Sequence, residues 1–181
     1  MTNLNEVLHK LEIKIPLIQR DYAQGRTDKE STKIRGSFLN AIALALEQDS
    51  ALHLDFVYGS IKKGAFIPLD GQQRLTTLFL LHWYFGKKEK ASIEHLFNFS
   101  YETRASSREF CSRLVGSEID FSADSLSAEI QDSSWFLPFW KYDPTIRSML
   151  NVLDDIHKRF HASNHLSRLD NLTFNFFELE E

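Results

Sequence analysis

The stretch PLDGQQRLTTLFLL at residues 68–81 marks the point where an extended run of the chain becomes a helical one. Apolar residues recur after it at the spacing of a helix, which we expect to span residues 72–86 and to end at Gly86. The core face of this helix is predicted to contain Leu75, Leu78, Phe79, His82 and Phe85. Asp70 to Arg74 therefore lie where a strand turns into a helix.

The turn itself, DGQQR, has the chemistry of an anion site. Gly71 lets the backbone turn tightly, and the first turn of the helix offers unpaired N–H groups to a phosphate. Arg74 adds a planar guanidinium suited to bidentate phosphate contact, while Gln72 and Gln73 supply neutral donors. Asp70 is a candidate Mg²⁺ ligand or water-orienting group. The alternative is that Asp70 only caps the helix and Arg74 is a solvated helix residue.

A second polar loop follows a short strand, which the alternation of apolar and charged residues predicts at residues 11–15. In this loop Gln19 is suited to hydrogen-bond the edge of a ligand, Arg20 to contact a phosphate or a base, and Tyr22 to stack. The alternative is a surface loop in which Arg20 forms an ion pair with Asp21.

The rest of the first half is predicted to hold a helix and a hairpin. A capping-box spacing and a four-residue apolar repeat predict a helix from about 29 to 48. Its expected core face consists of Ile34, Phe38, Ile42 and Leu46. Two β-rich runs, 53–59 and 65–69, flank a turn at 62–64 and indicate a hairpin.

The second half is predicted to be mainly helical between two strands. Residues 96–101 indicate a strand, and a helix is expected after it. Asp143 and Pro144 form an N-cap followed by proline at the first helical position, so a helix should continue from there to about 162. Residues 172–181 predict a strand, from which we expect the sequence to be a fragment of a larger fold.

Two other groups in the second half are weaker candidates for chemistry. His157, His161 and His165 recur every four residues, but no metalloprotease pattern accompanies them, so a solvated helix face is favoured over a metal site. Trp135 and Trp140 belong to an aromatic segment without arginine, for which packing in the core is favoured over base stacking.

Composition excludes several classes of protein. The chain has 181 residues with 43% hydrophobic and 25% charged, which fits one globular domain and excludes disorder. Residues 1–90 carry 13 Lys+Arg against 10 Asp+Glu, a net of +3, whereas residues 91–181 carry 8 against 15, a net of −7. An anion site is therefore expected in the first half. The single cysteine, and the lack of a signal or membrane-spanning segment, predict a cytoplasmic protein without membrane contact.

Three segments together resemble one protein family. IPLIQRDYAQGR at 15–26, FVYGSI at 56–61 and PLDGQQRLTTLFLL at 68–81 are similar to the N-terminal domain of GmrSD-type restriction proteins. The resemblance implies a ParB/sulfiredoxin-like core and nucleotide phosphates bound at Asp70–Arg74, with Gln19 and Arg20 across from them. It also implies hydrolysis of nucleoside triphosphates in bacterial defence against modified phage DNA.

These observations define the fold and the function that we expect. The fold is α+β, with a small mixed sheet in a core at 1–90 and an incomplete extension of helices and a terminal strand at 91–181. The expected function is nucleoside-triphosphate binding and Mg²⁺-assisted hydrolysis, with DNA reached through the full-length protein or a partner. The alternative is a non-catalytic module that binds DNA or senses its modification, with Lys62 and Lys63 contacting phosphates. A homo-oligomer is left open.

Overall fold

The computed structural model of the chain describes residues 1–16, 22–102 and 104–179. Within them, one curled sheet has the strand order β1-β6-β3-β4-β2-β5. Its strands are β1 (Thr2–Asn3), β2 (Glu12–Ile15), β3 (Leu52–Lys62), β4 (Ala65–Asp70), β5 (Phe99–Tyr101) and β6 (Leu172–Glu178). The helices are α1 (Leu4–Leu8), α2 (Lys29–Glu47), α3 (Gln72–Lys88), α4 (Ala105–Gly116), α5 (Leu126–Asp132) and α6 (Pro144–Phe160). The short 3₁₀ turns are η1 (Ala23–Gly25), η2 (Glu94–Asn98), η3 (Pro138–Tyr142) and η4 (Leu166–Asn171).

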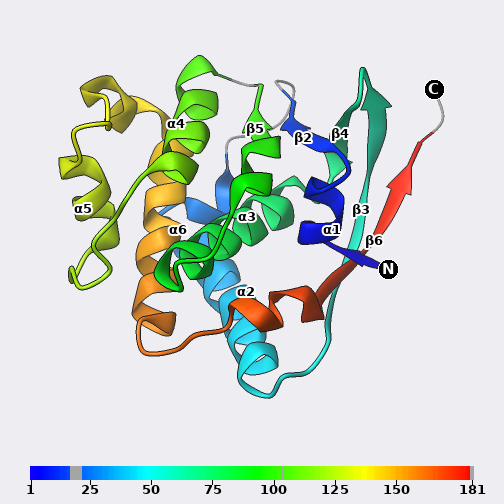
Figure 1. Ribbon diagram of the computed structural model, residues 1–181, viewed down its shortest axis with the longest axis horizontal. Coiled ribbons are helices and arrows are strands. Elements are labelled where there is room, and N and C mark those ends of the chain that lie inside the picture. The colour runs from blue at the N-terminus through cyan, green and yellow to red at the C-terminus, as the bar shows by residue number, and fades with distance from the viewer. Residues whose placement is uncertain (17–21, 103, 180–181) are drawn as a thin grey trace.

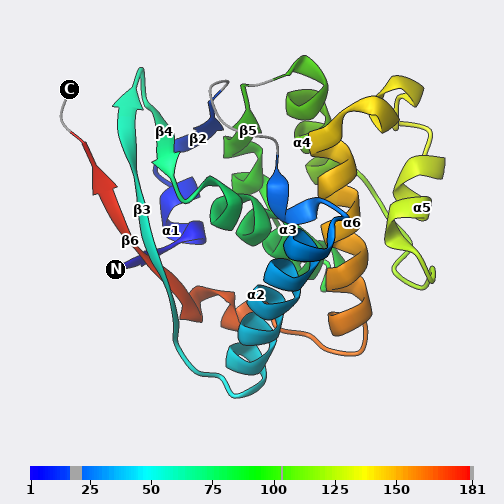
Figure 2. The ribbon, with the colours of Figure 1, turned by 180° about the vertical axis from the view of Figure 1, so that it is seen from behind.

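The sheet is mixed, as predicted. Strand β3 pairs antiparallel with β4 and parallel with β6, and β2 pairs parallel with both β4 and β5. Strands β5 and β6 come from the second half of the chain, so the sheet joins the two predicted parts on either side of residue 90. Figure 1 shows helices α2, α3 and α6 on one side of β3, β4 and β6, and Figure 2 shows the same arrangement from behind.

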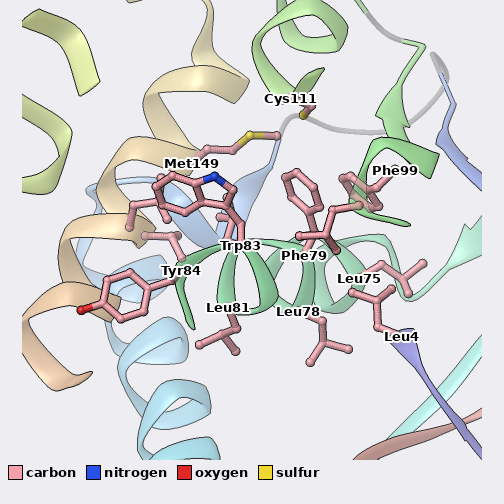
Figure 3. Close-up of a cluster of buried hydrophobic side chains, with 14 of the residues drawn as sticks. Leu4, Leu75, Leu78, Phe79, Leu81, Trp83, Tyr84, Phe99, Cys111 and Met149 are labelled. Atoms are coloured by element: carbon pink, nitrogen blue, oxygen red, sulfur yellow. The ribbon is translucent and has the colours of Figure 1, made fainter. Parts of the chain in front are cut away.

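Helix α3 lies at the centre of the molecule. Thirteen of its 17 residues are buried, including the whole predicted core face, because the sheet and the other helices cover it on several sides. In Figure 3, Phe79 and Trp83 point toward Cys111 and Met149, while Leu81 lies on the opposite side of the helix. A helix that is apolar on nearly all of its faces must be enclosed by other parts of the protein. Helix α3 is enclosed in this way.

The buried face of α2 differs from the predicted one. Ile34 is 53% exposed, whereas Arg35 is buried, with Leu39 and Ile42 further along the same face. Nε of Arg35 donates to Oδ2 of Asp155 at 2.6 Å, and its Nη1 donates to carbonyl oxygens of η1 and the residue after it. The expectation for Ile34 was wrong because this polar anchor takes the position facing α6.

Helix α6 begins as predicted, with Asp143 accepting from the backbone N–H of Thr145 at 2.8 Å. Trp140, just before it, is fully buried and Trp135 packs against the core, so the prediction of core packing is confirmed for these two residues. The prediction of a solvated histidine face is confirmed for His161, which is exposed, and was wrong for His157 and His165, which are buried. His157 lies between the hydroxyl of Tyr84 and a backbone carbonyl.

The last strand, β6, does not lie at the edge of the sheet. Over its first half it runs between β3 and the two-residue strand β1, with Thr2 opposite Phe174 and Leu52 opposite Leu172. None of the helices in the described part of the chain is long and apolar enough to cross a membrane.

Candidate functional site

The turn from β4 to α3 is built around Gly71. Gly71 has a φ of 86° and is the N-cap of α3, and it offers no side chain to the first turn of the helix. A Cβ at this position would lie 2.7 Å from Cγ2 of Val57 on β3. Both the left-handed backbone and this close approach require glycine. Asp70 is therefore the last residue of β4 rather than the cap of the helix.

Arg74 connects the first turn of α3 to β3 and β4. Its Nη2 donates to the backbone oxygen of Phe56 at 2.5 Å and to Oδ2 of Asp70 at 2.9 Å. The Nε atom of Arg74 is buried and has no hydrogen-bond partner among the residues that the structure describes. The guanidinium is thus fixed in place while one of its buried donors is left unsatisfied. Such a donor costs about 1 to 3 kcal/mol unless a ligand or water accepts from it.

The two glutamines of the turn point to different partners. Nε2 of Gln72 donates to the backbone oxygen of Pro68 at 2.8 Å, and the residue is buried. Oε1 of Gln73 accepts from the backbone N–H of Gln24 at 3.1 Å. Gln72 therefore stabilises the end of β4, although we expected it to supply a donor to a phosphate. Gln73 faces the loop that carries the second set of predicted residues.

Tyr22 anchors that loop to α3. Its hydroxyl lies 2.6 Å from Oγ1 of Thr77, which in turn donates to Oε1 of Gln24 at 2.6 Å. Tyr22 is fully buried, and this burial raises the pKa of its hydroxyl above the usual range. Stacking on a base requires an exposed ring, so the position of Tyr22 is that of a packing residue. Gln19 and Arg20 lie outside the described residues.

A pocket of about 480 Å³ opens beside the turn, on the side away from Tyr22. We call it the aromatic pocket, and it is lined by Asp55, Phe56, Tyr58, Asp70, Arg74, Phe177, Glu178 and Leu179. Two predicted site residues, Asp70 and Arg74, therefore meet side chains from β3 and from the end of β6. The structure thus brings together residues that are more than 100 positions apart in the sequence.

Comparison with protein families gives one match. The chain matches the family described as GmrSD restriction endonuclease, N-terminal domain, over residues 4–181. It belongs to this family. Comparisons with curated proteins and with solved structures gave no match, so the ParB/sulfiredoxin-like core stays a prediction. Membership places this GmrSD N-terminal domain in the restriction systems of phage defence.

The acidic groups of the GmrSD N-terminal domain bear on how Mg²⁺ would be held. Among the residues that the structure describes, no group of three or more His, Cys, Asp or Glu side chains is arranged to hold a metal ion. Mg²⁺ commonly binds one or two carboxylates and takes its other ligands from phosphates and water. The side chain of Asp70 is 54% exposed, so its carboxylate fits a site in which phosphates and water supply the other Mg²⁺ ligands.

Sequence reasoning missed the β3 and β6 contributions to the aromatic pocket of the GmrSD N-terminal domain. Phe56 and Tyr58 belong to the FVYGSI segment, which carried the family resemblance without being given a role. Residues two apart on a strand point to the same face, so two exposed aromatics at this spacing were a usable signal. Phe177 could not be placed beside them, because the parallel register of β3 with β6 is a tertiary property.

Proposed function

We propose that this domain binds a nucleoside triphosphate at the DGQQR turn and hydrolyses it with the help of Mg²⁺, within a restriction system that acts against phage. The observation that carries the proposal is the amino end of α3. This 17-residue helix begins at a glycine, so no side chain at the N-cap accepts from its first N–H groups. These N–H groups and the helix dipole favour a phosphate at this end.

The positions of Asp70 and Arg74 support the same proposal. Arg74 keeps a buried Nε–H donor without a partner among the described residues, and a phosphate oxygen would satisfy it. Asp70, on its own, would repel a phosphate. A Mg²⁺ ion bound to this carboxylate would neutralise the repulsion between Asp70 and the phosphate. The pairing of Asp70 with Arg74 holds both side chains at the mouth of the turn before any ligand arrives.

Catalysis at such a site would be mostly electrostatic. Hydrolysis of a triphosphate spreads negative charge over the oxygens of the transferred phosphoryl group, and groups that are already oriented stabilise this charge at low cost. The backbone N–H groups of Gln72 and Gln73 are fixed by the helix, and Arg74 is fixed by its bond to Phe56. We expect Gln19 and Arg20 to act from the opposite wall, as the family resemblance implies.

The test compares binding and turnover in two matched variants. Calorimetric titration with Mg²⁺ and a triphosphate measures binding, and phosphate release measures hydrolysis. We expect Asp70→Asn to lower the hydrolysis rate at least tenfold with a smaller effect on affinity. Asp49→Asn is the control, because Asp49 is also exposed and paired with an arginine but lies elsewhere. Absence of triphosphate binding at millimolar concentration would contradict the proposal.

A second candidate function is that of a DNA-binding module without catalytic activity. The observation that favours it is the tip of the β3–β4 hairpin, where Lys62 and Lys63 precede Gly64 in a turn with positive φ at the last two residues. Two adjacent cations at a protruding tip suit contact with a phosphate backbone. DNA binding that weakens steeply with salt, together with no affinity for triphosphate, would favour this candidate over hydrolysis.

A further inference from the structure

The aromatic pocket exposes ring surface that the core does not use. Phe56 is 48% exposed, Phe177 is 49% exposed, and their ring centroids lie 5.8 Å apart in a stacked arrangement. Tyr58 lies opposite Phe177 in the register of β3 and β6 and is also exposed. Figures 1 and 2 show no helix on this outer side of the two strands. Contiguous apolar surface of this kind marks a binding site.

The backbone of β3 is distorted at this pocket. Asp55 has a φ of 67°, and the register between β3 and β6 shifts between His53 and Phe56. A bulge redirects the side chains beside it, and a non-glycine residue in the left-handed region is held at a cost in stability. The bulge places Asp55 and Phe56 together on the pocket wall, next to the carbonyl that Arg74 binds.

Two carboxylates of the pocket have no partner among the residues that the structure describes. Within the described part of the chain, the carboxylates of Asp55 and Glu178 have neither a hydrogen-bond nor an ion-pair partner. They can only accept hydrogen bonds. A ligand that satisfies this pocket is therefore flat and apolar on its faces, with adjacent hydrogen-bond donors on one edge.

Guanine has this pattern of donors. Its N1–H and N2–H₂ groups are adjacent, and one carboxylate can accept a hydrogen bond from each of them. Adenine and cytosine offer only an amino group to a carboxylate. Uracil offers one N–H between two carbonyl oxygens, which a carboxylate repels. The volume of about 480 Å³ lies in the range of small-molecule sites.

We propose that the aromatic pocket binds a guanine base, and that this base belongs to the triphosphate whose phosphates lie at the DGQQR turn. The second part rests on the proposed function. Asp70 and Arg74 connect the two, because both line the pocket and both belong to the turn. Phe56 and Phe177 provide the stacking surface, and Asp55 and Glu178 determine the preference for guanine.

The test compares ligands that carry the base, the phosphates or both. The full chain is titrated with Mg²⁺ and each of GTP, ATP, CTP, UTP and inorganic triphosphate, and separately with guanosine. We expect GTP to bind about tenfold or more tightly than UTP, and guanosine to bind measurably without phosphates. Phe177→Ala should weaken GTP binding roughly 5- to 150-fold, the range for loss of one stacking aromatic.

Two further variants isolate the pocket. Asp55→Asn keeps a residue type that tolerates positive φ, so it should preserve the fold while removing most of the preference for GTP over UTP. Phe139→Ala removes an aromatic ring that is 57% exposed outside the pocket, and it should leave GTP binding unchanged.

The outcomes separate this inference from the proposed function. Equal binding of all four triphosphates, unaffected by Phe177→Ala, would overturn the guanine pocket and leave the phosphate site intact. Binding of guanosine without any binding of triphosphates would support the pocket and overturn the phosphate site. If Phe177→Ala instead dissociated a dimer in sedimentation and guanosine did not bind, the surface would be a protein interface and the inference would be wrong.

Discussion

The two sides of the first turns of α3 contrast sharply. On one side, which we call the closed side, Tyr22, Gln24, Gln73 and Thr77 form a chain of hydrogen bonds between the loop and the helix. On the other side, the aromatic pocket leaves rings exposed and polar groups unpaired. The closed side holds the turn in position, whereas the aromatic pocket has the properties of a ligand-binding surface. Stability and binding should therefore respond to different substitutions.

The largest effect is expected where the two sides meet, at Gly71. Gly71→Ala introduces a Cβ against Val57 and places an alanine at a φ of 86°, so it should lower the free energy of unfolding by about 2 to 5 kcal/mol. Gly64→Ala is the matched control, because Gly64 also has positive φ but a Cβ there meets nothing within 4 Å. It should cost only about 1 to 2 kcal/mol.

Urea unfolding of the two variants measures this difference. Equal losses in Gly64→Ala and Gly71→Ala would mean that β3 can move away from the turn. In that case the closed side would not be rigid, because its rigidity, like the shape of the aromatic pocket, depends on Val57 lying at a fixed position against the turn.

The next effect is the response to acid of His82, a buried residue further along α3. Burial lowers the pKa of His82 to about 4, and its Nδ1 lies 2.8 Å from the backbone oxygen of Leu78. The unfolded chain has the ordinary value of 6.5, so it takes up a proton at a higher pH than the folded chain. Stability should therefore be lost as the pH falls from about 6.5 to about 4, by up to about 3 kcal/mol.

Unfolding measured between pH 7 and pH 4 checks this expectation. His82→Gln should flatten the pH dependence, whereas His53→Gln, at an exposed position on β3, should leave it unchanged. An unchanged slope in His82→Gln would show that other histidines with lowered pKa, such as His95 and His165, dominate the acid response.

The smallest effect tests the closed side alone. Tyr22→Phe removes the hydroxyl that lies 2.6 Å from Thr77 and should cost about 1 to 2 kcal/mol of stability, because both partners are buried. Tyr142→Phe is the control, since Tyr142 is 72% exposed, and it should change stability very little. Thermal melts measure both variants. A loss of guanosine binding in Tyr22→Phe at full stability would contradict the separation of the two sides.

Local signals in the sequence predicted much of the fold. The strand-to-helix change at Asp70–Arg74, the cap at Asp143 and the strand at the end of the chain are all present. These features depend on neighbouring residues, and so a single sequence contains them. The position of β6 inside the sheet depends on pairing with residues more than 100 positions away, and local patterns do not encode it.

The candidate site shows the same limit. The prediction of DGQQR as a turn before a helix was correct, and Gly71 has the conformation that its residue type favours. The partners of Arg74 could not be predicted, because Phe56 reaches it only through the pairing of β3 with β4. Because Arg74 binds the backbone of β3, removing its side chain would also affect stability.

The pairing of β1 with β6 has a consequence for synthesis on the ribosome. Thr2 and Asn3 pair with Phe174 and Thr173, so β1 has no partner until about 170 further residues have been made. At about 5 to 20 residues per second, this delay is roughly 10 to 35 seconds. During that time β3 has an unpaired edge beside the exposed ring of Phe56, and such an edge is a template for aggregation. Slow translation should therefore lower the yield of folded protein more than it would for a fold built from local contacts.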